Sequence, residues 1–255
     1  MMIGKPLIKE LVMDREIRKR KVLDIILRTH IDRAMPIGST YIAELMGLSS
    51  ATIRNTMSDL YDEGYLEQPH TSAGRVPTER AYRLYVNSLL EQFDSNTTEI
   101  KKISRELLSR RQRYNDIIMR ISYSVSKLTG YTTFAVYPTD HIYMDGTYHI
   151  LEQPEFYNLK KIKKILGILD EKERFLSLIN SYLSTGSLKI HIGRENNLPG
   201  FEVCSLITAS YNIRGRVVGG LGIVGPIRMK YRRVIPVVRY CADSISRMLE
   251  GVYER

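Results

Sequence analysis

The 255-residue sequence predicts an α+β protein: an N-terminal winged helix-turn-helix, a long connecting helix and a C-terminal sensor-like domain with an antiparallel sheet. In residues 14–90, three short helical patterns are separated by turn residues and followed by a hairpin pattern. In residues 130–255, β-rich runs and helices occur in an order that does not fit a parallel βαβ chain. We therefore expect three parts, at 1–90, 91–129 and 130–255.

Charge and composition narrow the class of partner. The formal net charge of +10 indicates nucleic acid or an acidic membrane surface, with a merely solvated basic surface as the alternative. No run of about 18 apolar residues is present to span a membrane, and the charged first 11 residues do not resemble a signal peptide. The two cysteines, Cys204 and Cys241, form no metal-ligand pattern and favour the reducing cytosol.

The first three helices are predicted from periodicity and punctuation. A helical pattern over 14–33 ends before turn residues at 36–38, and Ser39 is expected to cap a short second helix that Gly47 ends. Ser49 or Ser50 is expected to cap a third helix that Gly64 closes. Three apolar residues of this helix recur at i, i+4 and i+7 and predict one buried face: Ile53, Met57 and Leu60.

A hairpin and a fourth helix follow the third helix. Residues 65–78 are typical of a strand, a polar loop and a return strand, which Pro77 restricts to a sheet edge. Thr78 then opens another helix, which carries Tyr82 and Val86. This order of elements is that of a winged helix-turn-helix.

The third helix and the hairpin hold the candidate binding residues. The helix face opposite the apolar one carries Ser50, Thr52, Arg54, Asn55, Thr56 and Ser58. Arg can bond guanine, Asn can bond adenine, and a Thr methyl can touch thymine. The hairpin tip offers His70, Thr71, Ser72 and Arg75 to the backbone or minor groove. The alternative is that Arg54 and Asn55 are ordinary solvated helix residues.

The N-terminal region is not uniformly basic. Residues 1–90 hold 13 Lys and Arg against 11 Asp and Glu, a net charge of only +2. DNA binding would therefore use a local patch, such as the run from Arg18 to Lys21 together with Arg54 and Arg75.

Residues 97–129 are expected to form one long helix with a heptad-like seam. Seven of the nine seam positions are apolar, with interruptions at Arg110 and Ser124. Two interpretations stay open: a coiled-coil dimer seam or a helix laid on a sheet. Further along, strands are expected at 131–137, 188–192, 203–211 and 216–224, and helices at 159–169, 171–183 and 230–249, with Pro236 near the start of the last or kinking it.

No enzyme signature is visible. The G-x-G-x-x-G pattern at 220–225 is followed by Pro226 instead of a helix, which favours close-packed strand glycines over a dinucleotide site. The five histidines are scattered without a metal or nucleophile pattern. Four acidic residues are expected in a solvated loop: Asp140, Asp145, Glu152 and Glu155.

Several stretches resemble the heat-inducible repressor HrcA family. LSSATIRN at 48–55, DL at 59–60 and GYLEQPHTSAGRVPT at 64–78 look like its helix and wing signature. IGREN at 192–196, SLITASY at 205–211 and GIVGPIRM at 222–229 look like its C-terminal domain. The resemblance covers nearly the whole chain.

The resemblance implies a winged helix joined to a GAF-like domain. We expect no cofactor. It implies a homodimer that binds an inverted-repeat operator of chaperone operons, with repression relieved by heat and a GroEL-type chaperonin as a partner. We expect the protein to be cytoplasmic and nucleoid-associated. Its DNA contacts carry over to Ser50, Thr52, Arg54 and Asn55, with the wing at 70–75. One departure is that the small domain usually inserted in the GAF-like part is missing here or reduced to 139–150, which would leave dimerisation to 97–129 and the GAF-like domain.

Two other functions are weighed against repression. GAF-like folds often hold small molecules, so a ligand-sensing regulator whose pocket is lined by Gly219, Gly220 and Gly222 is the first rival. An enzyme using the C-terminal domain is the second, and no catalytic site supports it.

Overall fold

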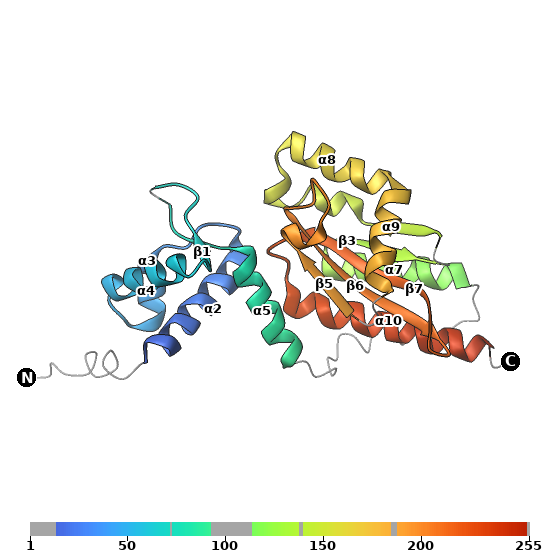
Figure 1. The fold of residues 1–255 in the computed structure, drawn as a ribbon, viewed down its shortest axis with the longest axis horizontal. Coiled ribbons are helices and arrows are strands. Elements are labelled where there is room, and N and C mark those ends of the chain that lie inside the picture. Colours follow the sequence, from blue (N-terminus) through green and yellow to red (C-terminus); the bar gives the residue numbers. More distant parts are fainter. Residues whose placement is uncertain (1–13, 72, 93–113, 138–139, 185–187, 254–255) are drawn as a thin grey trace, which may run out of the picture. The chain divides into compact units, whose positions relative to one another are not determined.

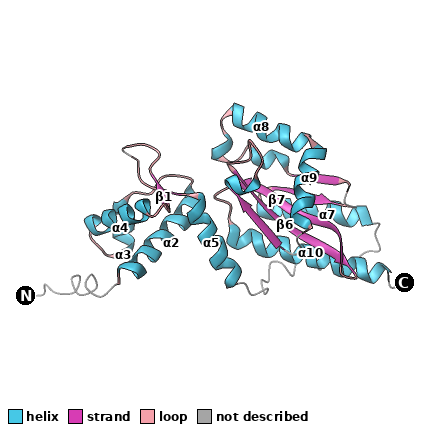
Figure 2. Cartoon of the chain, in the orientation of Figure 1, coloured by secondary structure: helices cyan, strands magenta, loops and turns pink. Residues whose placement is uncertain are grey.

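The computed structural model describes residues 14–71, 73–92, 114–137, 140–184 and 188–253 (Figure 1). The chain divides into two compact units, residues 1–93 and 94–255, and each is described by itself. Both units combine helices with antiparallel strands (Figure 2). The predicted α+β fold class is therefore confirmed.

The first unit has the predicted order of elements. It begins with α2 (Arg15–Arg33), α3 (Ser39–Met46) and α4 (Ser50–Asp62). The hairpin strands β1 (Leu66–Glu67) and β2 (Val76–Pro77) follow, and α5 (Glu79–Glu91) ends the unit.

Caps and turns set the helix boundaries of this unit. Gly47 follows α3 with a φ of 65°, a left-handed conformation that glycine adopts without steric cost. Ser49 is the N-cap of α4, as one of the two predicted candidates. The prediction for α3 is wrong by one residue, because Gly38 is its N-cap. The Ser39 hydroxyl instead lies 3.1 Å from that of Ser50.

The core of the first unit joins its four described helices, α2, α3, α4 and α5. Its apolar side chains that are at most 2% exposed are Val22, Ile26, Ile42, Ile53, Leu60, Leu66, Ala81, Tyr82 and Val86. Full burial of one large apolar side chain contributes about 1.5–3 kcal/mol. His30 Nδ1 and Tyr82 Oη lie 2.6 Å apart and link α2 to α5 with a hydrogen bond.

The second unit is built on one antiparallel sheet. Its strands are β3 (Thr132–Val136), β4 (Ile142–Asp145), β5 (Leu188–Ile192), β6 (Cys204–Ile213) and β7 (Arg216–Pro226). They lie in the order β4-β3-β7-β6-β5, and each neighbouring pair is antiparallel. The predicted strands are confirmed within a few residues, and β4 is an additional one.

Helices cover both faces of this sheet: α7 (Tyr114–Thr129), α8 (Leu159–Asp170), α9 (Lys172–Leu183) and α10 (Tyr231–Tyr253). Leu206 of β6 belongs to the apolar core formed with α8 and α9. The neighbouring Ser205 instead bonds Tyr231 of α10 at 2.7 Å. Because successive strand residues point to opposite faces, α10 lies on the face opposite α8 and α9. Pro236 lies inside α10.

α7 favours one of the two interpretations of the connecting helix. Only 114–129 of the expected helix at 97–129 lie within the described residues. Ile118, Ile121 and Val125 are fully buried, and α7 contacts β3 and α10. Ile117 and Ser124, which the predicted seam contained, are only half-buried. Over this stretch the helix therefore lies on a sheet, and its buried face is rotated from the predicted seam.

Of the four acidic residues expected in a solvated loop, Asp140 and Glu152 are exposed in turns, but the other two are not in a loop. Asp145 ends β4, and Glu155 lies in a short 3-10 helix, η2 (Pro154–Phe156). Glu155 pairs with Arg228, whose side chain is only 9% exposed. Sequence periodicity could not reveal this contact, because its partners are 73 residues apart.

The glycines of β7 are packing positions. A Cβ on Gly220 would lie 2.4 Å from the Leu183 side chain, and one on Gly222 would lie 2.3 Å from the Phe134 ring. The interpretation as close-packed strand glycines is confirmed. These glycines do not line a ligand pocket, since side chains already fill the space in front of them.

Both cysteines lie in the second unit as free thiols. Cys204 and Cys241 are buried. Burial raises the pKa of both thiols, that of Cys241 to about 12. Both are therefore protonated and shielded at neutral pH, which makes them poor nucleophiles.

Replacing Gly222 with Ala should lower the free energy of unfolding by about 1–3 kcal/mol, because the added methyl group meets Phe134 and the Ile207 carbonyl. Gly167 in α8 is the matched control, since a Cβ there meets nothing within 4 Å. Gly167→Ala should instead raise stability by about 0.5–1 kcal/mol. Urea denaturation measures both, and equal effects would contradict the packing role.

Candidate DNA interface

α4 has one apolar and one polar side, as predicted. Ile53, Met57 and Leu60 are at most 5% exposed, and α4 packs on α2 and α3. At the helix start, the Thr52 N–H donates to the Ser49 hydroxyl at 3.0 Å. This bond satisfies one of the backbone donors that a helix start leaves free. The apolar contact and the cap together fix the orientation of α4.

Five of the predicted base-reading residues lie on the outer side of α4. Arg54, Asn55 and Ser58 are exposed, and Ser50 and Thr52 are half-buried. The Ser50 and Thr52 hydroxyls already have hydrogen-bond partners in Ser39 and Ser49. The exposed groups are therefore a guanidinium, an amide and a hydroxyl.

The prediction that Thr56 belongs to this polar face is wrong. Thr56 is 2% exposed, and its hydroxyl donates to the Thr52 carbonyl at 3.0 Å and accepts from Arg18 Nε at 3.2 Å. Thr56 comes three residues after Ile53 and four before Leu60, which places it on the buried side of a helix.

Two of the predicted contact residues of the hairpin are exposed to solvent. His70 and Thr71 are exposed, whereas Ser72 lies outside the described residues. The Gln68 amide donates to the Thr71 and Ala73 carbonyls at 2.8 and 3.1 Å, which holds the turn. The contacts of His70, Thr71 and Ser72 with DNA stay predictions.

Arg75 lies at the base of the hairpin, away from its tip. Its backbone pairs with Ile37 in both directions at 2.9 Å, which adds a single bridge beside β2. The sequence did not predict this bridge. The neighbouring Gly74 lets the two backbones approach, because a Cβ on Gly74 would lie only 2.3 Å from the Ile37 carbonyl oxygen. The Arg75 guanidinium stacks 5.3 Å from the centre of the Tyr61 ring.

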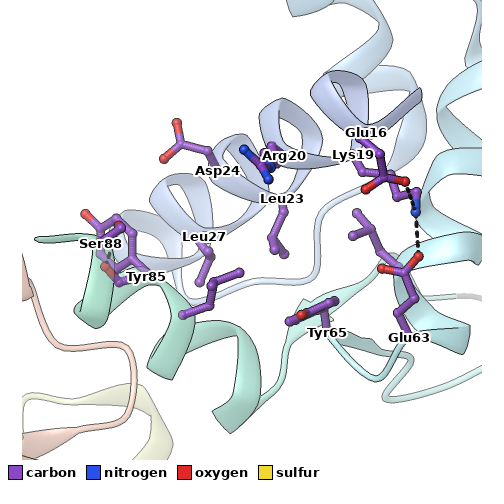
Figure 3. A pocket seen from close by; sticks show the side chains of 12 residues that line it. Glu16, Lys19, Arg20, Leu23, Asp24, Leu27, Glu63, Tyr65, Tyr85 and Ser88 are labelled. Carbon is purple, nitrogen blue, oxygen red and sulfur yellow. Dashed lines mark hydrogen bonds and ion pairs between the residues drawn. The ribbon is translucent and has the colours of Figure 1, made fainter. Parts of the chain in front are cut away.

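The basic run of α2 does not form one patch. Arg18 faces α4, but Lys19 forms ion pairs with Glu16 and Glu63, both at 2.6 Å. Arg20 lines a different cleft, with Leu23 and Tyr85 among its walls (Figure 3). Within this run, Arg18 therefore lies beside the outer side of α4, whereas Lys19 and Arg20 line the other cleft.

Arg15 is a residue of this surface that sequence reasoning missed. Its Nε and one terminal nitrogen donate to the two Asp59 carboxylate oxygens at 3.1 and 2.8 Å. The pair lowers the pKa of Asp59, with the hydrogen bond from Arg15 as the main cause. No sequence pattern signals this contact, since 44 residues separate its partners.

Other kinds of site receive no support from the described ranges. None of the described helices has the length and apolar character needed to cross a membrane. Within the same residues, no group of three or more His, Cys, Asp or Glu side chains could hold a metal ion.

Comparison with known proteins identifies the family. The model for the HrcA protein C terminal domain matches residues 49–235, which include α4 and the hairpin. The chain belongs to the HrcA family. A heat-inducible transcription repressor HrcA of Ruminiclostridium cellulolyticum is 31% identical over 333 residues, covering 90% of this chain and 96% of the relative. One of Pelotomaculum thermopropionicum is 28% identical, covering 92% and 97%.

This member of the HrcA family is shorter than these relatives. Ninety per cent of 255 residues is about 230, so roughly 100 of the 333 aligned positions have no counterpart in this chain. The difference has the size of a small domain and agrees with the missing insertion inferred from the sequence.

A solved structure supports the fold. A protein described as a hypothetical protein, solved at 2.2 Å resolution, superposes with a TM-score of 0.74 at 19% identity. The match covers 92% of this HrcA-family chain and 98% of that chain.

Ser49→Ala should lower the free energy of unfolding by about 1 kcal/mol, because it removes the cap of α4. Ser58→Ala, on the exposed side of the same helix, is the control and should stay within about 0.5 kcal/mol of the parent. Thermal and urea unfolding of the two variants check this. A Ser49 variant as stable as the control would show that the Ser49 cap does not stabilise the fold.

Proposed function

We propose that this HrcA-family chain is a transcription repressor of heat-shock genes that binds double-stranded operator DNA. α4 enters the major groove, and the hairpin contacts the backbone or the minor groove. The observation that carries the proposal is the outer side of α4, where Arg54 and Asn55 are exposed while Ile53 and Leu60 hold the opposite side in the core. The repressor names of the relatives support the choice of target genes.

The repressor is proposed to act as a homodimer on an inverted repeat, with each α4 reading one half-site. Half-sites one helical turn, about 34–36 Å, or a multiple apart would match such a dimer. Heat would shift the population of the binding-competent form, since about 1.4 kcal/mol changes an equilibrium tenfold. The chain would thus act by binding rather than by catalysis, in the cytoplasm and at the nucleoid.

A GroEL-type chaperonin is proposed as a further partner. Chaperonins bind exposed apolar side chains, and four such side chains lie between residues 148 and 159. These are Tyr148, Leu151, Tyr157 and Leu159, which are 51–81% exposed. Co-sedimentation with purified chaperonin tests this proposal.

Arg54→Ala and Asn55→Ala should each weaken operator binding by about 1–3 kcal/mol and relax base preference at the position read. Arg54→Lys is the matched control, because it keeps the charge and loses the planar fork. It should retain affinity for random duplex and lose discrimination. Variants that separate operator from random DNA as well as the parent would refute the base-reading role.

The operator itself is found by footprinting on the chaperone promoters of the source organism. Protection of an inverted repeat is the expected result. Binding to these promoters no tighter than to random duplex would overturn the proposed function.

A further inference from the structure

A polar hollow of about 460 Å³ lies between the start of α2 and the outer side of α4. Six residues line it: Arg15, Arg18, Asn55, Thr56, Ser58 and Asp59. Two guanidinium groups thus share a small space with the amide of Asn55, which belongs to the proposed base-reading surface.

Arg18 is held in this hollow by a single hydrogen bond, which its Nε donates. The Thr56 hydroxyl uses its hydrogen on the Thr52 carbonyl, so it accepts from Arg18 Nε. In the described part of the chain, the two terminal nitrogens of Arg18 have no further partner. Thr56 is buried, so its position is fixed by the core. Thr56 therefore positions the guanidinium and leaves its outer nitrogens free to donate.

Arg15 is occupied by a carboxylate. Asp59 accepts both of its hydrogen bonds in the fork geometry that a phosphate group also matches. The Arg15 side chain is 65% exposed and that of Asp59 is 26% exposed, so an incoming anion can reach the guanidinium. Asp59 both aligns Arg15 and repels such an anion.

We propose that this hollow seats one phosphate group of the DNA backbone, next to the bases that α4 reads. The inference rests on the proposed function and deepens it. Arg18 donates to the phosphate from the position that Thr56 sets. Arg15 is shared between the phosphate and Asp59, and Asp59 restrains the affinity for DNA of any sequence.

The other cations of α2 provide a control within the same helix. Arg20 lines the separate cleft beside Leu23 and Tyr85 (Figure 3). Arg18→Ala and Arg20→Ala therefore make the same change of charge on two sides of one helix. Only the first removes a donor from the hollow.

The first experiment measures binding of the full chain to promoter duplex and random duplex over a range of salt concentration. Arg18→Ala should weaken binding to both duplexes by the same factor. It should also make the negative slope of log K against log salt shallower by about 0.9 per bound protomer. Arg20→Ala should leave the slope unchanged. Equal slopes for the two variants, or loss of discrimination by Arg18→Ala alone, would overturn the proposal.

Two further variants test the positioning residues. Thr56→Val keeps the size of the side chain and every charge, and should weaken binding to both duplexes. It should have no further effect in the Arg18→Ala background, because the residue acts through Arg18. Asp59→Asn should tighten binding to both duplexes, because the substitution removes a negative charge that would repel the phosphate in the hollow. An additive Thr56 effect or weaker binding by Asp59→Asn would contradict the assigned roles.

The outcomes for the parent keep the two hypotheses apart. A parent chain that does not distinguish the promoter from random duplex refutes the proposed function. A parent that does so, while Arg18→Ala behaves as Arg20→Ala, refutes only the phosphate seat. Circular dichroism of each variant confirms that the comparison is made between folded chains.

Discussion

Burial of Ile53, Met57 and Leu60 against α2 and α3 decides which side chains of α4 face outward. A helix has one register, so packing these three residues inward leaves Arg54 and Asn55 on the opposite side. The same packing brings Arg18 within 3.2 Å of the Thr56 hydroxyl. The base-reading surface and the hollow beside it therefore depend on one apolar contact, and a change of helix register would remove both.

Local rules predicted much of this fold. Periodicity and caps were sufficient for α4, where Ser49 and the apolar triplet agree with the structure. Alternation and apolar runs were sufficient for β5 and β7. They failed at Thr56, whose hydroxyl suggests exposure although its helical position is buried. Contacts between distant residues, such as Arg15 with Asp59, leave no local signal and needed the structure.

The second unit of this short family member keeps a continuous five-stranded sheet with β4 at one edge. About 100 aligned positions of the Ruminiclostridium relative are absent here, yet β4 pairs with β3 along its full length. The segment after β4 is tied to the rest of the unit by Glu155 and Arg228. Removing one partner of a pair this sheltered leaves a charge with little access to water, which is costly. A continuous sheet with β4 as its edge strand is thus compatible with the loss of the insertion.

Cleavage of DNA from a tethered reagent tests the central claim most directly. Cys204 and Cys241 are buried, so a Ser58→Cys variant offers one reactive thiol for an iron–EDTA label. On a promoter duplex, the label at position 58 should cut within the protected repeat, and the same label on Arg20→Cys should not. Strong cuts from position 20 with none from position 58 would show that the outer side of α4 does not face the bases.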